Sequence, residues 1–169
     1  AYEIYQCDWS SDVCSSDLEP GKLIGDVFQL AEALGVAEFT VVGHDWGGAI
    51  AWGVAIAGQA SGKVTRAVIA NAPHPAIFQK LLYTDPVQRA ASQYMREFRD
   101  PANDALVREH GLAGILAKAV KWARSERLER EEREALAADW QNRKAAFGML
   151  NWYRASDRKS TRLNSSHTD

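Results

Sequence analysis

An aspartate stands at the apex of a tight turn within the segment FTVVGHDWGGAIAW, which begins at Phe39. Gly43 lies two residues before Asp45, and Gly47 lies two residues after it. A strained turn with small flanking residues lifts its apex side chain clear of a sheet, and it directs the backbone N–H of the next residue, here Trp46, at the reacting group. The pattern therefore predicts a nucleophile elbow.

An aspartate at this apex could act in two ways. Aspartate carboxylates have a reference pKa of about 3.9, so they are ionised at neutral pH and need no adjacent base before they attack. Such a group can attack saturated carbon in a strained epoxide or an alkyl halide, whereas attack on an ester carbonyl would give a labile anhydride. Alternatively, Asp45 caps the helix that begins at Trp46, because aspartate is a favoured N-cap residue. The pattern alone leaves both roles open.

Helical and strand-like patterns alternate around this turn. Apolar residues recur at helical spacing over residues 22–35, which predicts an amphipathic helix with one buried face that ends near Gly35. Residues 39–44 and 64–73 are apolar, β-branched runs, typical of parallel strands buried on both faces. Residues 45–58 are small and apolar nearly all round, as expected of a helix packed closely on a sheet. This order predicts an α/β fold with a parallel sheet.

The character of the sequence changes after Pro75. Residues 76–156 read as helical, with many charges and no further strand pattern. Asp85 is predicted as an N-cap with Pro86 at the first helical position, and apolar residues from there to Phe98 share one face. The sequence thus predicts part of an α/β core over residues 19–75, followed by a helical insertion.

The two ends of the chain have a different origin. DWSSDVCSSDL begins at Asp8 and DRKSTRLNSSH begins at Asp157. Both segments can be encoded by one DNA element read on its two strands in shifted frames, and this element resembles a sequencing adapter. We therefore expect residues 1–18 and 157–169 to be artefactual, and the remainder to be an internal fragment of a longer protein.

The composition gives no indication of several common functions. The formal net charge is −2, and the two ends carry six acidic and three basic residues, so the rest of the chain is close to neutral. Neither nucleic acid nor an anionic membrane is therefore predicted as a partner. Cys7 and Cys14 both lie in the excluded end, so no disulfide or metal site is predicted. No apolar run could span a bilayer, and nothing reads as secreted, so we expect a cytoplasmic protein; its oligomeric state is not predicted.

Two motifs, VVGHDWGGAIAW (residues 41–52) and LNWYRA (residues 150–155), resemble those of the epoxide hydrolase branch of the α/β-hydrolase superfamily. The resemblance covers essentially all of residues 19–156. It implies a partial α/β-hydrolase core with a helical lid over residues 76–156, no cofactor, and a small hydrophobic epoxide as substrate. It also implies that Asp45 is the nucleophile and forms an alkyl ester.

The same resemblance implies two proton donors on the lid. Tyr153 of the Asn-Trp-Tyr-Arg segment and Tyr94 would hydrogen-bond the epoxide oxygen and supply a proton as the ring opens. A phenol, with a reference pKa of about 10, is a suitable acid for an alkoxide leaving group. From the residues alone, an aromatic core role is the simpler interpretation of both tyrosines, and the resemblance favours the catalytic role.

Two further residues are predicted to line the site. Trp46 would give its backbone N–H as an oxyanion donor, and its indole would wall the pocket. In the related haloalkane dehalogenases the equivalent tryptophan helps to hold the departing halide, so dehalogenation is an alternative activity. A non-catalytic small-ligand binder with this fold is a second alternative. His74 lies where the core passes into the lid, and it could line the same site.

The resemblance also implies groups that this sequence does not contain. The family activates water with a histidine backed by an acid, and it has a His-Gly segment upstream of the elbow. The histidine and its acid are expected beyond Ser156, outside this chain. We therefore expect the chain as written to be at best alkylated at Asp45 without turning over. We also expect that it does not fold stably, because two strands cannot replace a full sheet.

Overall fold

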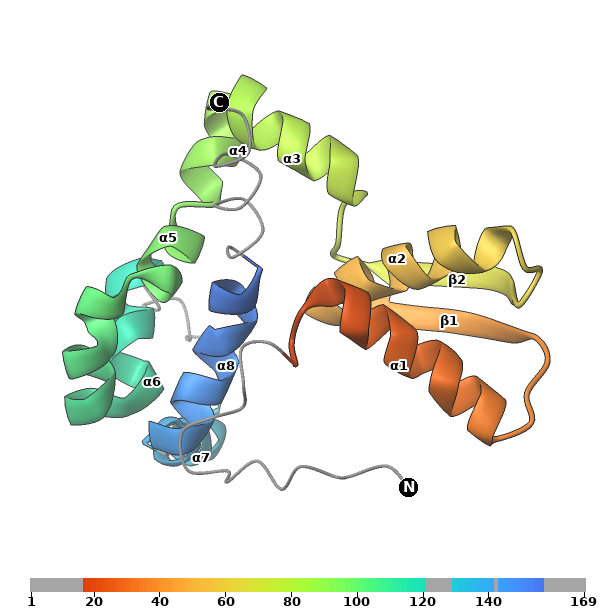
Figure 1. Ribbon diagram of the computed structural model, residues 1–169. Helices are drawn as coiled ribbons and strands as arrows, with labels where there is room; N and C mark the ends of the chain where they lie inside the picture. Colours follow the sequence, from red (N-terminus) through yellow and green to blue (C-terminus); the bar gives the residue numbers. More distant parts are fainter. Residues whose placement is uncertain (1–16, 121–128, 142, 157–169) are drawn as a thin grey trace, which may run out of the picture. The chain divides into compact units, whose positions relative to one another are not determined.

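The computed structural model describes residues 17–120, 129–141 and 143–156. These residues fall into two compact units: one spans Glu19–Ala90, and the other holds the described residues from Ala91 onward together with Asp17 and Leu18. The first unit holds both strands, and the second is helical (Figure 1). Residues 1–16 and 157–169, nearly all of the two ends predicted to be artefactual, lie outside the described residues.

The strand-bearing unit alternates helices and strands. Its elements are α1 (Pro20–Ala33), β1 (Phe39–His44), α2 (Trp46–Gln59), β2 (Val64–Ala70), α3 (Pro75–Thr84) and α4 (Pro86–Ala91). β1 and β2 pair in parallel, with Val42 opposite Val68 and His44 opposite Ala70. α2 connects the two strands and packs on both of them. The predicted α/β order with parallel strands is therefore confirmed.

The end of α1 follows from a single glycine. Gly35 has a φ of 67°, a left-handed conformation that glycine adopts without strain. Its N–H donates to Glu32 O (2.9 Å), and the N–H of Val36 donates to Ala31 O (2.8 Å). This is a Schellman motif, which satisfies the last carbonyls of the helix. The helix stops where the sequence predicts, and the chain turns toward β1.

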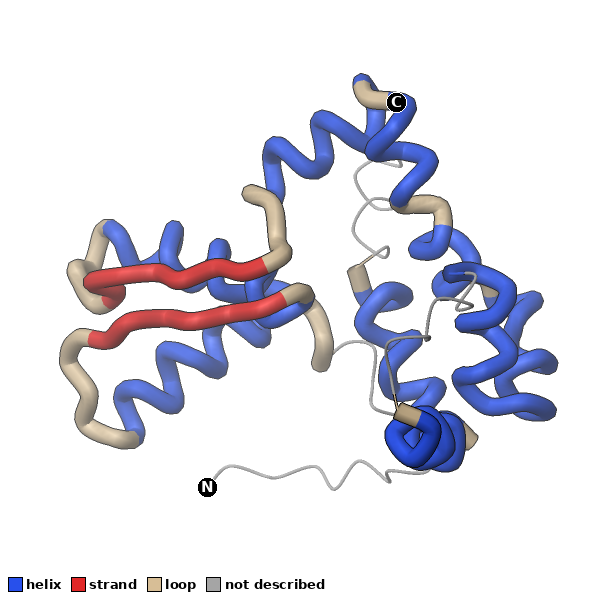
Figure 2. The backbone as a smooth tube through the Cα atoms, turned by 180° about the vertical axis from the view of Figure 1, so that it is seen from behind, coloured by secondary structure: helices blue, strands red, loops and turns tan. Residues whose placement is uncertain are grey.

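The sheet is covered on one face only. α1 and α2 lie on the same side of the two strands, as seen from behind in Figure 2. Gly43 is buried on the covered face, whereas Val42 and Val68 on the opposite face are 71% and 55% exposed. The prediction that the strands are buried on both faces is wrong for the described residues, because no helix of the strand-bearing unit covers the second face. Leu30 and Leu34, predicted on the buried face of α1, are exposed as well.

The second unit is a helical cluster. Its elements are α5 (Tyr94–Arg99), the short 3-10 helix η1 (Pro101–Asn103), α6 (Asp104–Val120), α7 (Arg130–Trp140) and α8 (Arg143–Ala155). Its buried core consists of Phe98, Val107, Leu112, Ile115, Ala146 and Leu150. α6 is interrupted at Gly111, where φ is 64°. A Cβ at Gly111 would stand 2.1 Å from the carbonyl O of Trp140, so glycine lets α7 approach this break.

The predicted helix after Asp85 forms in two pieces. The carboxylate of Asp85 accepts a hydrogen bond from the N–H of Val87 (2.8 Å), and Pro86 is the first residue of α4, so the predicted cap is confirmed. α4 and α5 are nevertheless separate helices. The apolar face predicted across both is divided, because Val87 is exposed while Phe98 is buried.

The strand-bearing unit continues past Pro75, where the sequence suggested a boundary. α3 and nearly all of α4 belong to it. Arg89 of α4 donates from Nε to the carbonyl O of Leu82 in α3 (3.1 Å), which ties these two helices together. The limits of the helical lid, residues 76–156, stay a prediction.

Two further observations on the described residues concern membranes and metal ions. No helix in these residues is long and apolar enough to cross a membrane. Their His, Cys, Asp and Glu side chains form no group of three or more that could hold a metal ion.

Candidate active site

Asp45 lies at the carboxyl end of β1, in the sharp turn into α2. Its φ and ψ are 53° and −120°, and a positive φ is uncommon for any residue but glycine. Such a conformation costs about 1–3 kcal/mol and persists where the surrounding structure fixes it. The N–H of Asp45 donates to Ala70 O at the end of β2 (3.1 Å), and the N–H of Ala49 donates to Asp45 O (3.0 Å). The turn is strained, as a nucleophile elbow is.

The side chain of Asp45 does not cap the helix that follows. Among the described residues, no N–H of α2 donates to its carboxylate, and the side chain is exposed. Two other aspartates do cap: Asp85 accepts from the backbone of α4, and Asp100 accepts from Ala102 N–H (2.9 Å). The cap alternative for Asp45 thus lacks the hydrogen bond that defines it. The carboxylate can instead meet a ligand.

The glycines of the turn are not equally required. A Cβ on Gly43 would stand 2.3 Å from Gly47 O and 2.8 Å from the Cβ of Ala51, and a Cβ on Gly48 would stand 2.6 Å from the Cβ of Ala72. In the described part of the chain, a Cβ on Gly47 would meet no atom within 4 Å. Gly43 and Gly48 therefore allow the close packing of β1, α2 and the segment after β2. Gly47 contributes the backbone on which Gly43 packs.

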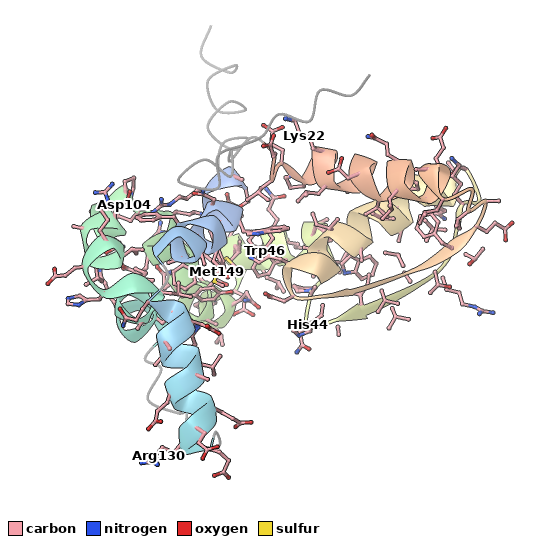
Figure 3. The ribbon with its side chains drawn as sticks, turned by 90° about the horizontal axis from the view of Figure 1, so that it is seen from below. Lys22, His44, Trp46, Asp104, Arg130 and Met149 are labelled. Carbon is pink, nitrogen blue, oxygen red and sulfur yellow. The ribbon has the colours of Figure 1, made fainter. Side chains whose placement is uncertain are left out.

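His44 and Trp46, the neighbours of Asp45, differ in their surroundings. Figure 3 shows His44 at the end of β1, with its ring directed away from α1 and α2. His44 is exposed, whereas Trp46 is half-buried and opens α2. At the start of a helix the backbone N–H groups point outward from the positive end of the helix dipole. This position suits the predicted oxyanion donor, and the role itself stays a prediction.

His74 is the N-cap residue of α3 and packs against Trp52. Its Nδ1 accepts from the N–H of Ala76 (3.3 Å), so the neutral ring carries its proton on Nε2. The rings of His74 and Trp52 meet edge to face, with centroids 4.9 Å apart. Trp52 Nε1 also donates to the carbonyl O of Ala72 (3.1 Å). These contacts hold the segment after β2 against α2, so His74 has a structural role beside its predicted place in the site.

Asn71 is a neighbour of the elbow that the sequence analysis missed. His44 pairs with Ala70, so the next residues along the two strands are Asp45 and Asn71. Both have a φ of 53°, and they are the two non-glycine residues with positive φ in the described ranges. In open α/β sheets, ligands bind at the carboxyl ends of the strands. The available signal was an asparagine within the apolar run predicted as the second strand, residues 64–73, which the structure ends at Ala70.

Tyr94 and Tyr153 come together in the helical unit. Their ring centroids are 6.0 Å apart and the rings are inclined by 80°. Phe98 contacts both, at 5.5 Å from Tyr94 and 4.8 Å from Tyr153. Both tyrosines are half-buried and pack on the helical core. The structure thus brings the two predicted proton donors together. It also shows that both rings pack in the aromatic core, which is the role suggested by the residues alone. Asp45 belongs to the other unit.

An ion pair holds α5 on α6. Lys118 Nζ lies 2.8 Å from the Glu97 carboxylate and donates to Asn103 Oδ1 (2.7 Å). Asn103 is buried and donates to the carbonyl O of Glu97 (2.8 Å). The hydrogen bond from Lys118, with a smaller contribution from Asn103, lowers the pKa of Glu97 below its ordinary value. This network fixes the helix that carries Tyr94.

Known proteins resemble this chain along most of its length. The profile of the alpha/beta hydrolase fold family matches residues 16–154. Epoxide hydrolase 3 of Xenopus tropicalis is 30% identical over 150 residues, which cover 78% of this chain and 37% of that protein. Human epoxide hydrolase 4 is 35% identical over 79 residues, 47% of this chain and 21% of that protein. This chain therefore spans less than half the length of either relative.

Two solved structures agree with these relatives. One belongs to the epoxide hydrolases found in metagenomes from hot environments, and it is 67% identical with a TM-score of 0.75, covering 87% of this chain and 49% of that chain. The other is the epoxide hydrolase of Bacillus megaterium bound to an inhibitor, 28% identical with a TM-score of 0.64, covering 85% of this chain and 50% of that chain.

Proposed function

Because the chain belongs to the alpha/beta hydrolase fold family, we propose that the protein opens epoxides to diols through an ester formed on Asp45. The backbone of Asp45 carries this proposal, since a strained conformation at a strand end presents an exposed carboxylate that makes no cap. The tyrosine pair of the helical unit and the relatives named epoxide hydrolases support the choice of epoxide.

In the first step, the Asp45 carboxylate attacks a carbon of the epoxide ring. A carbon–oxygen bond forms to Asp45, the ring carbon–oxygen bond breaks, and its electron pair moves to the epoxide oxygen. Tyr153 or Tyr94 gives this oxygen a proton, and the second phenol hydrogen-bonds it. A proton transferred in the transition state by a positioned side chain typically contributes about 10²- to 10⁴-fold in rate.

In the second step, water attacks the carbonyl carbon of the Asp45 ester. The backbone N–H of Trp46 would stabilise the oxyanion that forms there. The carbon–oxygen bond between the Asp45 carbonyl and the alkyl group then breaks, which releases the diol and restores the carboxylate. The tyrosinate takes back a proton, so the sum is epoxide plus water giving diol. We assign activation of this water to no residue of the chain.

The proposal extends to the surroundings of the site. Residues 76–156 would form a lid over a small hydrophobic epoxide, and His74 and Trp46 would line its pocket. The protein would work in the cytoplasm, which subcellular fractionation of cells that express a tagged full-length protein would test.

The direct test follows the alkylation of Asp45. A chimaera in which residues 19–156 replace the matching half of the 67%-identical epoxide hydrolase is exposed to styrene oxide. We expect diol release and, under single turnover in heavy-oxygen water, incorporation of the heavy isotope into the Asp45 carboxylate. Asp45→Asn should abolish both, whereas Asp26→Asn on the exposed side of α1 should change neither. The unaltered chain is tested beside it by intact mass, where the styrene oxide adduct should accumulate on Asp45.

Three results would contradict the proposal. Styrene oxide labelling that persists in Asp45→Asn would show that another residue is the nucleophile. Turnover of phenethyl bromide without turnover of styrene oxide would indicate a dehalogenase. Reversible binding of both compounds without any labelling would indicate a non-catalytic binder.

A further inference from the structure

Two arginines exchange hydrogen bonds between α5 and α8. Arg99 Nε on α5 donates to the carbonyl O of Tyr153 on α8 (3.1 Å). Arg154 Nε on α8 donates to the carbonyl O of Phe98 on α5 (3.3 Å). Each helix thus has an aromatic residue followed by an arginine, and each arginine binds the carbonyl of the aromatic residue on the other helix. We refer to these four residues as the arginine clasp.

The clasp uses backbone groups that a helix leaves unpaired. The carbonyls of Phe98 and Tyr153 both lie in the last turn of their helices, where carbonyl groups have no N–H partner within the helix. A cation near this end also interacts favourably with the helix dipole. Arginine suits the position because its planar fork holds two acceptors in a fixed geometry, whereas the ammonium of lysine is a compact charge without that fork.

A second contact fixes each guanidinium. Arg154 Nη2 donates to the Asp104 carboxylate at the start of α6 (2.5 Å), and both side chains are mostly shielded from solvent. Arg99 Nη2 donates to Ser156 Oγ (3.1 Å), and this hydroxyl donates to the carbonyl O of Tyr153 (2.7 Å). Each arginine is therefore held at two points, and it adds to the Phe98–Tyr153 ring contact in packing α5 on α8.

We propose that Arg99 and Arg154 are positioning residues, which fix Tyr94 and Tyr153 relative to each other for epoxide opening. The inference rests on the proposed function. Tyr94 is on α5 and Tyr153 is on α8, so the spacing of the two phenols is set by how these helices pack. Both phenols must reach one oxygen atom, and a misplacement of about 1 Å can reduce a rate about 100-fold.

The test compares two electrophiles on Asp45 in the chimaera. Opening of styrene oxide needs a proton from a tyrosine, whereas displacement of bromide from phenethyl bromide does not. The readout is the ratio of the two labelling rates. Arg99→Ala and Arg154→Ala should each lower this ratio about tenfold or more. Arg96→Ala removes an exposed arginine of the same α5 helix and should leave the ratio unchanged.

Two controls separate positioning from folding. Arg99→Lys and Arg154→Lys keep the charge and lose the fork, so they should lower the ratio in the same direction even where the alanine variants do not fold. When both tyrosines are replaced by phenylalanine, Arg99→Ala should cause no further fall in the ratio. Arg99 acts on the ratio only through the two phenols, which are then absent.

The outcomes distinguish the two proposals. An equal fall in both labelling rates would make the clasp a merely structural feature and overturn the inference. An unchanged ratio in the lysine variants would also overturn it, while Asp45-dependent labelling would leave the proposed function intact. If styrene oxide does not label Asp45 in the parent chimaera, the proposed function is rejected instead.

Discussion

The backbone of Gly43 is packed directly on that of Gly47: a Cβ on Gly43 would stand 2.3 Å from the carbonyl O of Gly47. The two residues flank the Asp45 turn, one at the end of β1 and one at the start of α2. This contact lets the helix begin immediately beside the strand, so the turn between them must be sharp. The strain at Asp45 is the consequence.

Gly43→Ala should destabilise the strand-bearing unit. The added methyl would meet backbone atoms and the Cβ of Ala51, none of which is a flexible chain end, so we expect a loss of about 1–3 kcal/mol in the free energy of unfolding. Gly47→Ala is the matched control. It meets no described atom within 4 Å and should stabilise the helix by up to about 1 kcal/mol. Urea unfolding measures the stability of both variants. Equal unfolding midpoints for Gly43→Ala and Gly47→Ala would contradict the close packing of Gly43 on Gly47.

Asp45→Gly should be more stable than Asp45→Asn. Glycine adopts positive φ without a Cβ clash, whereas asparagine keeps the strain of the native turn. Part of the gain is offset by the greater freedom of glycine in the unfolded chain. We expect a net difference of about 1 kcal/mol, within the range for one strained residue. Thermal unfolding of both inactive variants measures it, and an asparagine variant of equal or greater stability would argue against strain at this position.

Tyr153→Phe should slow the labelling of Asp45 by styrene oxide about 100-fold, because it removes a proton donor for the epoxide oxygen. Tyr94→Phe should have an effect in the same direction. Tyr83 is 74% exposed on α3, so Tyr83→Phe should be neutral. Rapid quenching followed by peptide mass spectrometry gives the rates. If styrene oxide labels Asp45 in both single variants at the parent rate, the two tyrosines have only a packing role in the helical core.

The contribution of Glu97 to stability should depend on pH. The hydrogen bond from Lys118 lowers the pKa of Glu97 in the folded state, so folding favours its ionised form. The stabilisation is therefore complete above the ordinary pKa of 4.5 and is lost as pH falls through the lower folded pKa. The parent should exceed Glu97→Gln in thermal midpoint at pH 7, and the difference should vanish in acid. A difference between the parent and Glu97→Gln that stays constant with pH would exclude the linkage.

Local features of the fold could be predicted from the sequence because they depend on neighbouring residues. Gly35 ends α1, Asp85 caps α4, and the glycines around Asp45 mark a sharp turn. Each follows from a residue type that satisfies or strains the backbone a few positions away. The alternation of helix and strand patterns likewise gave the α/β order.

Burial and long-range contacts could not be predicted in the same way. Val42 is apolar, yet it is exposed because its burial depends on which layer covers the sheet face. The Nε hydrogen bonds of Arg99 and Arg154 end on backbone carbonyls, which every residue possesses, so no residue pattern marks these two bonds. The pairing of Tyr94 with Tyr153 came from family resemblance, since their helices are distant in sequence.

The arginine clasp has a consequence for the recombination of related genes. A crossover between the coding regions of α5 and α8 would combine the aromatic–arginine pair of one helix from one parent with the partner helix from the other parent. Each arginine reaches the opposite helix only where the rings of Phe98 and Tyr153 pack between the two helices. The two segments should therefore be inherited together, although the chain separates them. Libraries that exchange residues 94–99 and 143–156 together should retain folded members more often than those that exchange either segment alone.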